Sequence, residues 1–319
     1  MDKMKLGGIL PALILCLASA SIAEESILVL HPAGEKFQET VKGIREGLGA
    51  DYKVADQEIS KDVQVATVSA AIKAKSPKAV VLMDNSSIRI WKEYQQQSGD
   101  TATPSLSLMG IMIDKAVSGI ANATGISYEV PAVTVFVNLR SLMKQPLKTV
   151  GVVQRASMDD FIAKQSSFCE PENIHLKTYR VEDKSDAAEG LRKGLDDLLG
   201  KNDVDALWVL NDNFFLNPKL LKEVWLPAAA KYRKPIVVGV ESLVQSNLNF
   251  GVYAVLPDHY ALGSQAANVL LELQDNGWVA TGRPVDQPLS VLKYLNTKVS
   301  RKTLSIDEEK LKEIDRQVE

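Results

Sequence analysis

Short apolar runs alternate with amphipathic segments along most of the chain. The apolar runs of the first half span residues 26–32, 52–59, 78–84 and 104–114. Between the first two runs, apolar residues recur at helical spacing and a glycine follows them: Phe37, Val41, Ile44, Leu48 and Gly49. Apolar strands that alternate with helices favour a parallel sheet covered on both faces. We therefore expect an α/β fold built on doubly wound parallel sheets.

The same alternation restarts in the second half of the chain. Its apolar runs span residues 147–154, 174–181, 205–212, 235–241 and 249–257. Two consecutive series of roughly a hundred residues each predict two similar lobes. No long linker separates them, so we expect the chain to pass between the lobes in short crossings, near 125–127 and near 257–258.

The N-terminal segment has the features of a secretory signal peptide. Lys3 and Lys5 precede an apolar stretch at 9–17, and Ser21 and Ala23 place small residues at a cleavage site. The alternative, a short membrane anchor, fits less well because the stretch is too short to span a bilayer. We expect residues 1–23 to be removed and the product to lie outside the cytoplasm, in the periplasm or its equivalent.

The net charge excludes some classes of partner, and the predicted cleavage would leave a single cysteine. The 319 residues are 45% hydrophobic, and the net charge is only −3, so no basic surface for nucleic acid is expected. Cys16 lies within the predicted signal peptide, where Leu15 before it argues against lipidation. Cys169 then has no partner for an internal disulfide.

Polar residues follow the predicted strands, where ligands bind in doubly wound sheets. Ligands of such folds lie beyond the carboxyl ends of the strands. The candidate ligand-binding residues at these ends are His31, Asp84, Asn85, Ser86, Asp114, Gln154, Asn211, Asp212, Asn213, Glu241 and Ser242. The alternative for each position is a turn or a helix N-cap, for which Asp, Asn and Ser are the preferred residues.

The stretch LWVLNDNFF (207–215) poses this choice most clearly. Four apolar residues predict a buried strand, and Asn211, Asp212 and Asn213 follow it directly. We expect Asp212 to pair with an ammonium or hydroxyl group of a ligand and Asn213 to cap the next helix. The alternative is that Asp212 also serves only the turn.

The sequence contains no recognisable catalytic set. His31, His175 and His259 are scattered without metal-ligand spacing, and no phosphate-binding or dinucleotide-binding glycine motif follows the first strand. We therefore expect a protein without enzymatic activity, metal or cofactor.

Five segments resemble one family. NATGISYEVP (122–131) resembles the N-x-T-G-x-S segment of ABC-transporter solute-binding proteins, in the branch associated with tryptophan or tyrosine. The other four are VDALWVLNDN (204–213), KPIVVGVESLV (234–244), GVYAVLPDHYALGSQAANVLLEL (251–273) and PLSVLKYLNTKVSRKTL (288–304). Two loops depart from the family pattern: Asp84-Asn85-Ser86 replaces small residues such as T-P-A, and Asp114-Lys115 replaces D-P.

The resemblance implies a type I periplasmic binding protein fold, with two lobes joined by three crossings, the third near Arg283 and Pro284. The implied boundaries are 24–127 plus 258–284 for the first lobe and 128–257 plus 285–319 for the second. The implied function is the capture of a small polar ligand, such as an amino acid, by a monomer that delivers it to an ABC permease. A sensory protein that signals to a membrane receptor or kinase is the first alternative, and an exported enzyme is the second.

Overall fold

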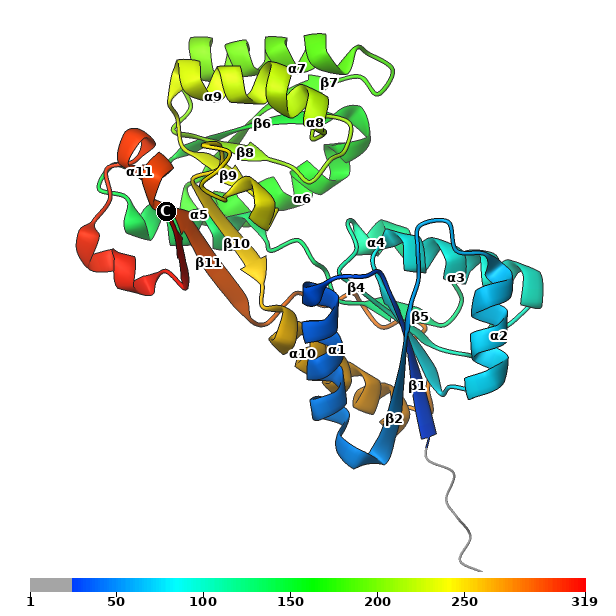
Figure 1. The fold of residues 1–319 in the computed structure, drawn as a ribbon. Coiled ribbons are helices and arrows are strands. Elements are labelled where there is room, and N and C mark those ends of the chain that lie inside the picture. Colours follow the sequence, from blue (N-terminus) through cyan, green and yellow to red (C-terminus); the bar gives the residue numbers. More distant parts are fainter. Residues whose placement is uncertain (1–24) are drawn as a thin grey trace, which may run out of the picture.

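The computed structural model describes residues 25–319, which form two lobes, each built on its own sheet (Figure 1). The predicted signal peptide at 1–23 lies outside the described residues. Within residues 25–319, no helix combines the length and the apolar character needed to cross a bilayer.

The first lobe contains a five-stranded parallel sheet in the order β2-β1-β3-β4-β5. Its strands are β1 (Glu25–His31), β2 (Tyr52–Glu58), β3 (Ala79–Met83), β4 (Ser105–Leu108) and β5 (Ala123–Gly125). Its helices are α1 (Glu35–Leu48), α2 (Val65–Lys75), α3 (Asn85–Ser98), α4 (Ile113–Ala116) and α10 (His259–Asp275).

Alternate residues of the central strands enter two different cores. Ile27 and Val29 of β1 pack with α1 and α10, whereas Leu28 and Leu30 pack with α2 and α3. Because successive side chains of a strand point to opposite faces, a continuous apolar run such as this one requires cover on both faces. The predicted doubly wound arrangement is confirmed for this lobe.

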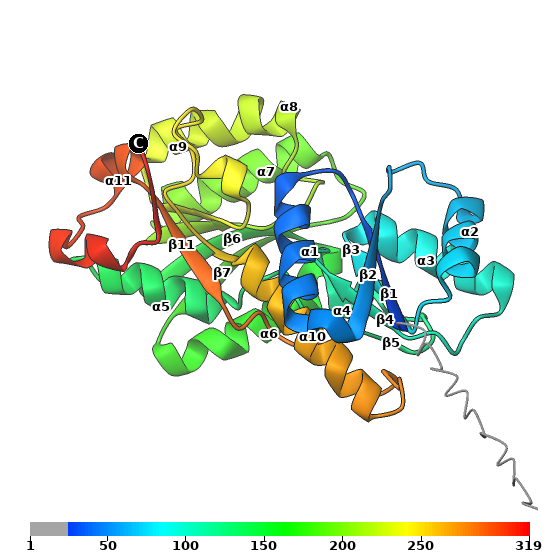
Figure 2. The same ribbon diagram turned by 60° about the horizontal axis from the view of Figure 1, so that its bottom comes forward.

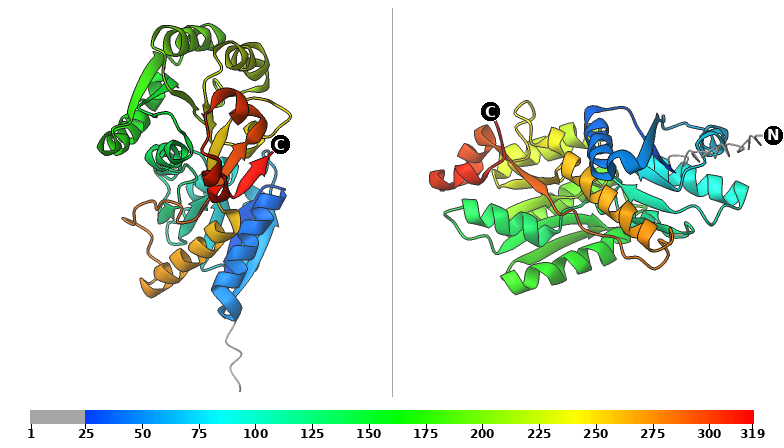
Figure 3. Two further views of the ribbon diagram at one scale, coloured as in Figure 1. Left: turned by 90° about the vertical axis from the view of Figure 1, so that its left-hand side faces the viewer. Right: turned by 90° about the horizontal axis from the view of Figure 1, so that it is seen from below.

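Helices α1 and α10 lie side by side although they are far apart in the sequence (Figures 2 and 3). A Cβ atom at Gly43 would lie 2.2 Å from the carbonyl oxygen of Tyr260, and one at Gly263 would lie 2.1 Å from that of Thr40. Only glycine permits such a close approach of two backbones. This contact fixes α10 to the first lobe.

The second lobe contains a seven-stranded sheet in the order β12-β11-β10-β9-β8-β6-β7. Its strands are β6 (Thr149–Arg155), β7 (His175–Val181), β8 (Ala206–Val209), β9 (Ile236–Val238), β10 (Tyr253–Pro257), β11 (Val291–Asn296) and β12 (Arg316–Val318). Its helices are α5 (Ala132–Leu142), α6 (Asp159–Cys169), α7 (Ala187–Leu195), α8 (Pro218–Leu220), α9 (Leu226–Tyr232) and α11 (Thr297–Thr303).

The pairing of β11 with β10 is the exception to the predicted parallel arrangement. Strand β11 runs antiparallel to β10, and Val291 at its start pairs with Pro257 at the end of β10. The chain leaves the second lobe at the end of β10 and returns beside the same point. The strand that follows can therefore pair with β10 only by running back along it.

The predicted strands have counterparts in β1–β4 and β6–β10. The elements not predicted from their own residues are β5, β11, β12, α4, α5, α10 and α11. The predicted strand at 104–114 was too long, since β4 ends at Leu108. After it, Met109 and Met112 have left-handed backbone angles, with φ of 56° and 55°, which no strand accommodates. Residues 109–112 form a loop instead.

Three short crossings join the lobes, and two of them run side by side. Ile126 follows β5 in the first crossing and pairs with Asp286 of the third. The backbone amide of Ser127 donates to the carbonyl oxygen of Asp286 at 2.8 Å, and the amide of Asp286 donates to that of Gly125 at 3.0 Å. The third crossing thus comes just after the predicted Arg283-Pro284.

The second crossing lies between β10 and α10. The backbone amide of Asp258 donates to the carbonyl oxygen of Ser290 at 3.1 Å, which ties this crossing to the third. The side chain of Asp258 caps α10 by accepting from the amide of Ala261. The exact lobe boundaries given above stay a prediction.

Candidate functional site

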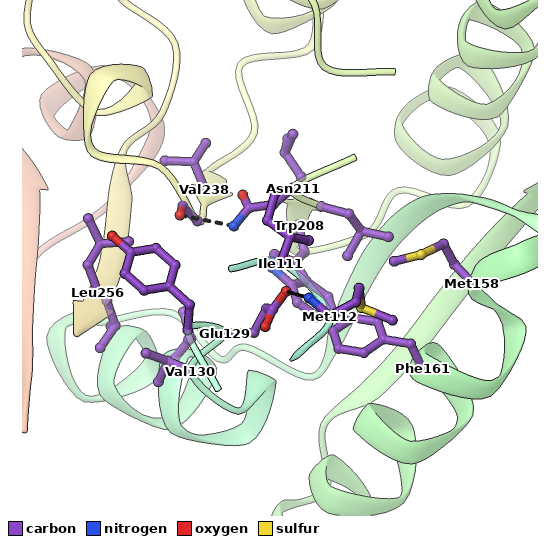
Figure 4. A pocket seen from close by; sticks show the side chains of 16 residues that line it. Ile111, Met112, Glu129, Val130, Met158, Phe161, Trp208, Asn211, Val238 and Leu256 are labelled. Carbon is purple, nitrogen blue, oxygen red and sulfur yellow. Dashed lines mark hydrogen bonds between the residues drawn. The ribbon is translucent and has the colours of Figure 1, made fainter. Parts of the chain in front are cut away.

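A pocket lies at the carboxyl ends of β8, β9 and β10, beside the first crossing. Its cavity volume is about 40 Å³, and about 540 Å³ when all space between protein atoms, including space open to solvent, is counted. The second lobe contributes Val135, Met158, Phe161, Trp208, Val209, Leu210, Asn211, Val238, Gly239, Val255 and Leu256. Ile111 and Met112 come from the loop after β4, and Tyr128, Glu129 and Val130 from the first crossing (Figure 4). Its position agrees with that of ligand sites in doubly wound sheets.

Aromatic rings form much of the pocket wall. Trp208 packs edge-on against Phe136, with the ring centroids 5.6 Å apart, and lies 6.1 Å from Phe161. Because Phe136 is fully buried in α5, the tryptophan is held from behind by the core. Tyr128 contributes a third ring to the lining. Such a wall suits a ligand with an apolar or aromatic body.

Glu129 places a carboxylate in this apolar lining. One carboxylate oxygen accepts a hydrogen bond from the backbone amide of Met112 at 2.8 Å, and the other lies 3.3 Å from the hydroxyl group of Ser127. Burial raises the pKa of Glu129, although these hydrogen bonds oppose the shift. Figure 4 shows the side chain extending toward Met112, with Phe161 and Met158 beyond it.

The loop at 109–112 is held in its strained conformation by side chains on both sides. The amide of Asn85 donates to the carbonyl oxygen of Ile111 at 2.9 Å and accepts from its backbone amide at 2.7 Å. Glu129 holds the next residue, Met112. Left-handed non-glycine residues persist where the surrounding structure fixes them, and they cluster at ligand sites. The predicted site residue Asn85 thus positions the pocket wall from the first lobe.

Asn211 is the predicted site residue that lines the pocket itself. Its amide nitrogen donates to the carbonyl oxygen of Gly239 at 3.1 Å. Its amide oxygen is buried and has no hydrogen-bond partner among the described residues. A buried acceptor without a donor costs about 1–3 kcal/mol, so a ligand donor at this point would be favourable.

Asp212 has a cationic partner within the protein. Arg155, at the end of β6, donates from Nε to one carboxylate oxygen at 2.7 Å and from Nη2 to the other at 2.9 Å. The side chain of Asp212 is 5% exposed, and it also accepts from the backbone amide of Phe214 at 3.0 Å. The ligand contact predicted for Asp212 stays untested, but both of its oxygens are already engaged.

Asn213 does not cap the following helix, contrary to the prediction. The N-cap of α8 is Asn217, whose side chain accepts from the backbone amide of Leu220 at 3.1 Å. Asn213 is exposed in a turn that precedes α8. In this turn the backbone amides of Phe215 and Leu216 donate to the carbonyl oxygen of Asp212. This turn delays the start of the helix by one helical turn.

Asp114 lies where the two lobes touch. Its carboxylate, on α4 of the first lobe, lies 3.3 Å from Lys164 Nζ on α6 of the second. Next to it, Lys115 donates to the carbonyl oxygen of Ser157 at 3.2 Å. These exposed contacts are individually weak. They bridge the two lobes.

Two further candidates are buried in the strands. The ring of His31 has no exposed surface, stacks on Phe37, and has Nε2 3.5 Å from Asp56 Oδ2. Gln154 is 5% exposed and donates to Asp159 at 2.7 Å. Neither lines the pocket.

The remaining candidates lie at helix starts. Asp84 caps α3 by accepting from the backbone amides of Ser86 and Ser87, both at 2.9 Å. Glu241 and Ser242 lie exposed in the short 3-10 turn Glu241–Leu243, after β9. The observed contacts of Asp84 are therefore those of a helix N-cap, the alternative to a ligand-binding role.

Tyr128 connects the pocket to the second crossing. Its hydroxyl group lies 3.0 Å from Nε2 of His259, the first residue of α10, and the two rings stack. His259 Nδ1 lies 3.8 Å from the carboxylate of Glu39 on α1. Burial, with Lys36 second, lowers the pKa of His259, whereas burial raises that of Tyr128. A pocket residue, a crossing and the first lobe therefore meet at one point.

The side chains that commonly bind metal ions are dispersed in the described part of the chain. Between residues 25 and 319, no three His, Cys, Asp or Glu side chains are grouped closely enough to hold a metal ion. The only cysteine in this range, Cys169, is buried, and burial raises its pKa to about 11.

The structure brings together a smaller set than the eleven residues predicted, and it adds others. Asn211 lines the pocket, and Asn85 holds its wall. Tyr128, Glu129 and Trp208 were missed as site residues. A signal was present, because Glu129 interrupts apolar neighbours inside the segment 122–131 that carries the resemblance.

Comparison with family models and with curated proteins gives no match. Solved structures do match over most of the chain. The ligand-free, open structure of a substrate-binding protein with adhesive properties from Clostridium difficile has a TM-score of 0.64 and 14% identity, covering 92% of this chain and 100% of that one.

Two ligand-bound structures are also similar. An ABC domain in complex with L-Trp from Streptococcus pneumonia has a TM-score of 0.56 and 19% identity, covering 92% of this chain and all of that one. An ABC transporter substrate-binding protein from Desulfitobacterium hafniense in complex with Leu has a TM-score of 0.51 and 14% identity, covering 79% and 84%. The chain thus shares the fold of these structures, the type I periplasmic binding protein fold that its sequence resemblance predicts.

Proposed function

We propose that this protein is an extracytoplasmic solute-binding protein that captures a small ligand between its lobes and delivers it to an ABC permease. The observation that carries the proposal is the pocket beside the first crossing, which takes its lining from both lobes and from the crossing itself. A ligand bound there would contact every part that has to move when the lobes close. The fold supports the same function, because the similar structures are binding proteins.

The mechanism would be closure around the three crossings. Weak exposed contacts, such as that between Lys164 and Asp114, bridge the lobes at the pocket side. Rearranging them requires little free energy, whereas ligand contacts made only in the closed form would favour closure. Of the remaining predicted residues, Ser86, Asn213, Glu241 and Ser242 stay part of this proposal as the margins of the closing surfaces. His31, Gln154 and Asp212 are buried, and Asp84 caps α3, so these four would support the closing surfaces from behind.

Export and partners are part of the same proposal. The signal peptide at 1–23 would place a monomer outside the cytoplasm, where a membrane permease reads the closed form. Catalysis is not proposed, because the pocket has one carboxyl group and no arrangement of nucleophile and base. A sensory role would use the same closure and differs only in the membrane partner.

A thermal-shift screen of small solutes tests the proposal. A ligand at 100 times its Kd should stabilise the folded protein by about 2.7 kcal/mol. Stabilisation by a small solute, lost when Trp208 is replaced by Ala, is the expected result. Absence of stabilisation by amines, amino acids and sugars alike would contradict it. Uptake of the labelled solute by cells with and without the protein then separates transport from sensing.

A further inference from the structure

The charge of the pocket lining is one-sided. Of its described lining residues, none is Lys, Arg or His, and Glu129 contributes the one carboxyl group. In residues 25–319 the carboxylate of Glu129 has no ion-pair partner within 4.0 Å, and the charged neighbour that acts on its pKa is another acid, Asp114. A partly buried carboxylate without a counter-ion favours a cation brought from outside.

Two side chains of the pocket offer hydrogen-bond acceptors, which also favours a cationic ligand. The amide nitrogen of Asn211 is used by Gly239, and its buried oxygen is the free atom. Glu129 offers only acceptors when ionised. A ligand group that binds Glu129 and the amide oxygen of Asn211 must therefore be a donor, as an ammonium group is. A ligand carboxylate at this point would place acceptors against acceptors.

Two lysines and one arginine near the pocket are already engaged. Lys164 pairs with Asp114, and Lys115 donates to the carbonyl oxygen of Ser157. Arg155 is held by Asp212 and Asp183. None of the three lines the pocket, so none is placed to neutralise a carboxylate bound there.

The remaining lining suits the body of an organic cation. The rings of Tyr128, Phe161 and Trp208 border the pocket together with Met112 and Met158. An ammonium group is attracted to the face of an aromatic ring, and apolar walls take up the carbon skeleton. Figure 4 shows Glu129 next to Met112 and below Ile111, near the middle of this lining.

We propose that the pocket selects an organic ammonium ion with an apolar or aromatic body and without a carboxylate, with Glu129 and the amide oxygen of Asn211 as the groups that receive the cation. This inference rests on the proposed solute-binding function and names its ligand class. It also moves the cation-binding role predicted for Asp212 to Glu129.

Three matched probes test the inference on the unmodified protein by isothermal titration. Phenethylamine carries only the ammonium group, 3-phenylpropanoate only the carboxylate, and phenylalanine both. We expect phenethylamine to bind at least about tenfold more tightly than phenylalanine, a difference of 1.4 kcal/mol or more. Binding of 3-phenylpropanoate should not be detectable at millimolar concentration.

A charge-removing variant identifies the group responsible. Glu129→Gln should weaken phenethylamine binding at least about thirtyfold, because the ammonium loses its buried counter-ion. Glu223→Gln, the same change at an exposed position in the second lobe, should leave binding unchanged. If Glu129→Gln does not fold, the three-probe comparison still decides, because it uses the unmodified protein.

The contradicting results separate this inference from the proposed function. Tighter binding of phenylalanine or 3-phenylpropanoate than of phenethylamine would overturn the cation assignment and leave a solute-binding protein. If none of the three binds but sugars or other neutral solutes stabilise the protein, the ligand class is again wrong and the function stands. If no solute of any class stabilises it, both fail.

Discussion

The guanidinium group of Arg155 holds the carboxylate of Asp212 through two hydrogen bonds, of 2.7 and 2.9 Å. The pair joins the ends of β6 and β8, which are neighbours in the sheet although they lie far apart in the sequence. The ring of Phe214 lies under the guanidinium, 5.2 Å away. The acidic residue that the sequence offers as a ligand group is therefore part of the framework behind the pocket.

Replacing Asp212 with Asn should reduce stability more than ligand affinity. The change removes the charged partner of Arg155. A hydrogen bond to a charged group contributes about 1.5–3 kcal/mol to the free energy of unfolding. Chemical denaturation should show a loss of that order, while phenethylamine affinity changes less than about threefold, under 1 kcal/mol. Asp203→Asn is the matched control, because the carboxylate of Asp203 pairs with Lys234 but is itself exposed, and it should cost under about 1 kcal/mol. A large loss of affinity without loss of stability would restore the ligand role of Asp212.

Replacing Asn85 with Ala should loosen the pocket wall. The variant loses both hydrogen bonds to Ile111, each worth about 1 kcal/mol. We expect faster hydrogen exchange at residues 109–112 and a severalfold weaker affinity for phenethylamine. Gln96→Ala, exposed in the same helix, is the control. Unchanged exchange at 109–112 would show that the loop holds its conformation without Asn85.

The affinity for a cation should rise with pH as Glu129 ionises. Burial raises the pKa of Glu129 in the folded protein above its value in the unfolded chain. The protonated side chain therefore stabilises the fold fully at a pH below the unfolded-state pKa, and this stabilisation is lost as pH rises through the folded-state pKa. Cation binding has the opposite sign, because it requires the ionised carboxylate. Titration of phenethylamine from pH 4.5 to 7.5 should give a rising affinity that levels off above the pKa of Glu129.

A second group titrates near this pH range and requires a control. His259 contacts Tyr128 at the edge of the pocket, and its pKa is lowered by burial. Glu129→Gln retains His259 and should give an affinity that no longer rises with pH. If the pH dependence persists in Glu129→Gln, His259 rather than Glu129 controls binding.

The thiol of Cys169 should be unreactive in the folded protein. It has no exposed surface, and burial raises its pKa to about 11, so the reactive thiolate is scarce at neutral pH. A thiol reagent should label it only after unfolding in denaturant. Rapid labelling of the native protein would show that the core around α6 opens readily.

The sequence predicts the elements well because each one is encoded locally. The apolar run of β1 and the helical spacing in α1 both lie within a few residues. Contacts between strands depend on the strand order, which the local sequence pattern does not predict. Arg155 could not be matched with Asp212 because nothing in either segment shows that β6 and β8 are neighbours.

The site was only partly predicted because it does not lie at strand ends alone. Asn211 lies at such an end and does line the pocket. Glu129 and Tyr128 lie in a crossing, which becomes a wall only once both lobes are folded around it. Asp84 shows the converse, since a polar residue at a strand end is sufficiently explained by its capping of α3.

Small-angle scattering with and without a saturating ligand tests lobe closure most directly. Saturation is established first by isothermal titration, with phenethylamine or with the solute that most stabilises the protein. Closure around the three crossings predicts a smaller radius of gyration in the bound state. An unchanged radius at saturation would contradict it and would indicate a rigid pocket that binds without moving the lobes.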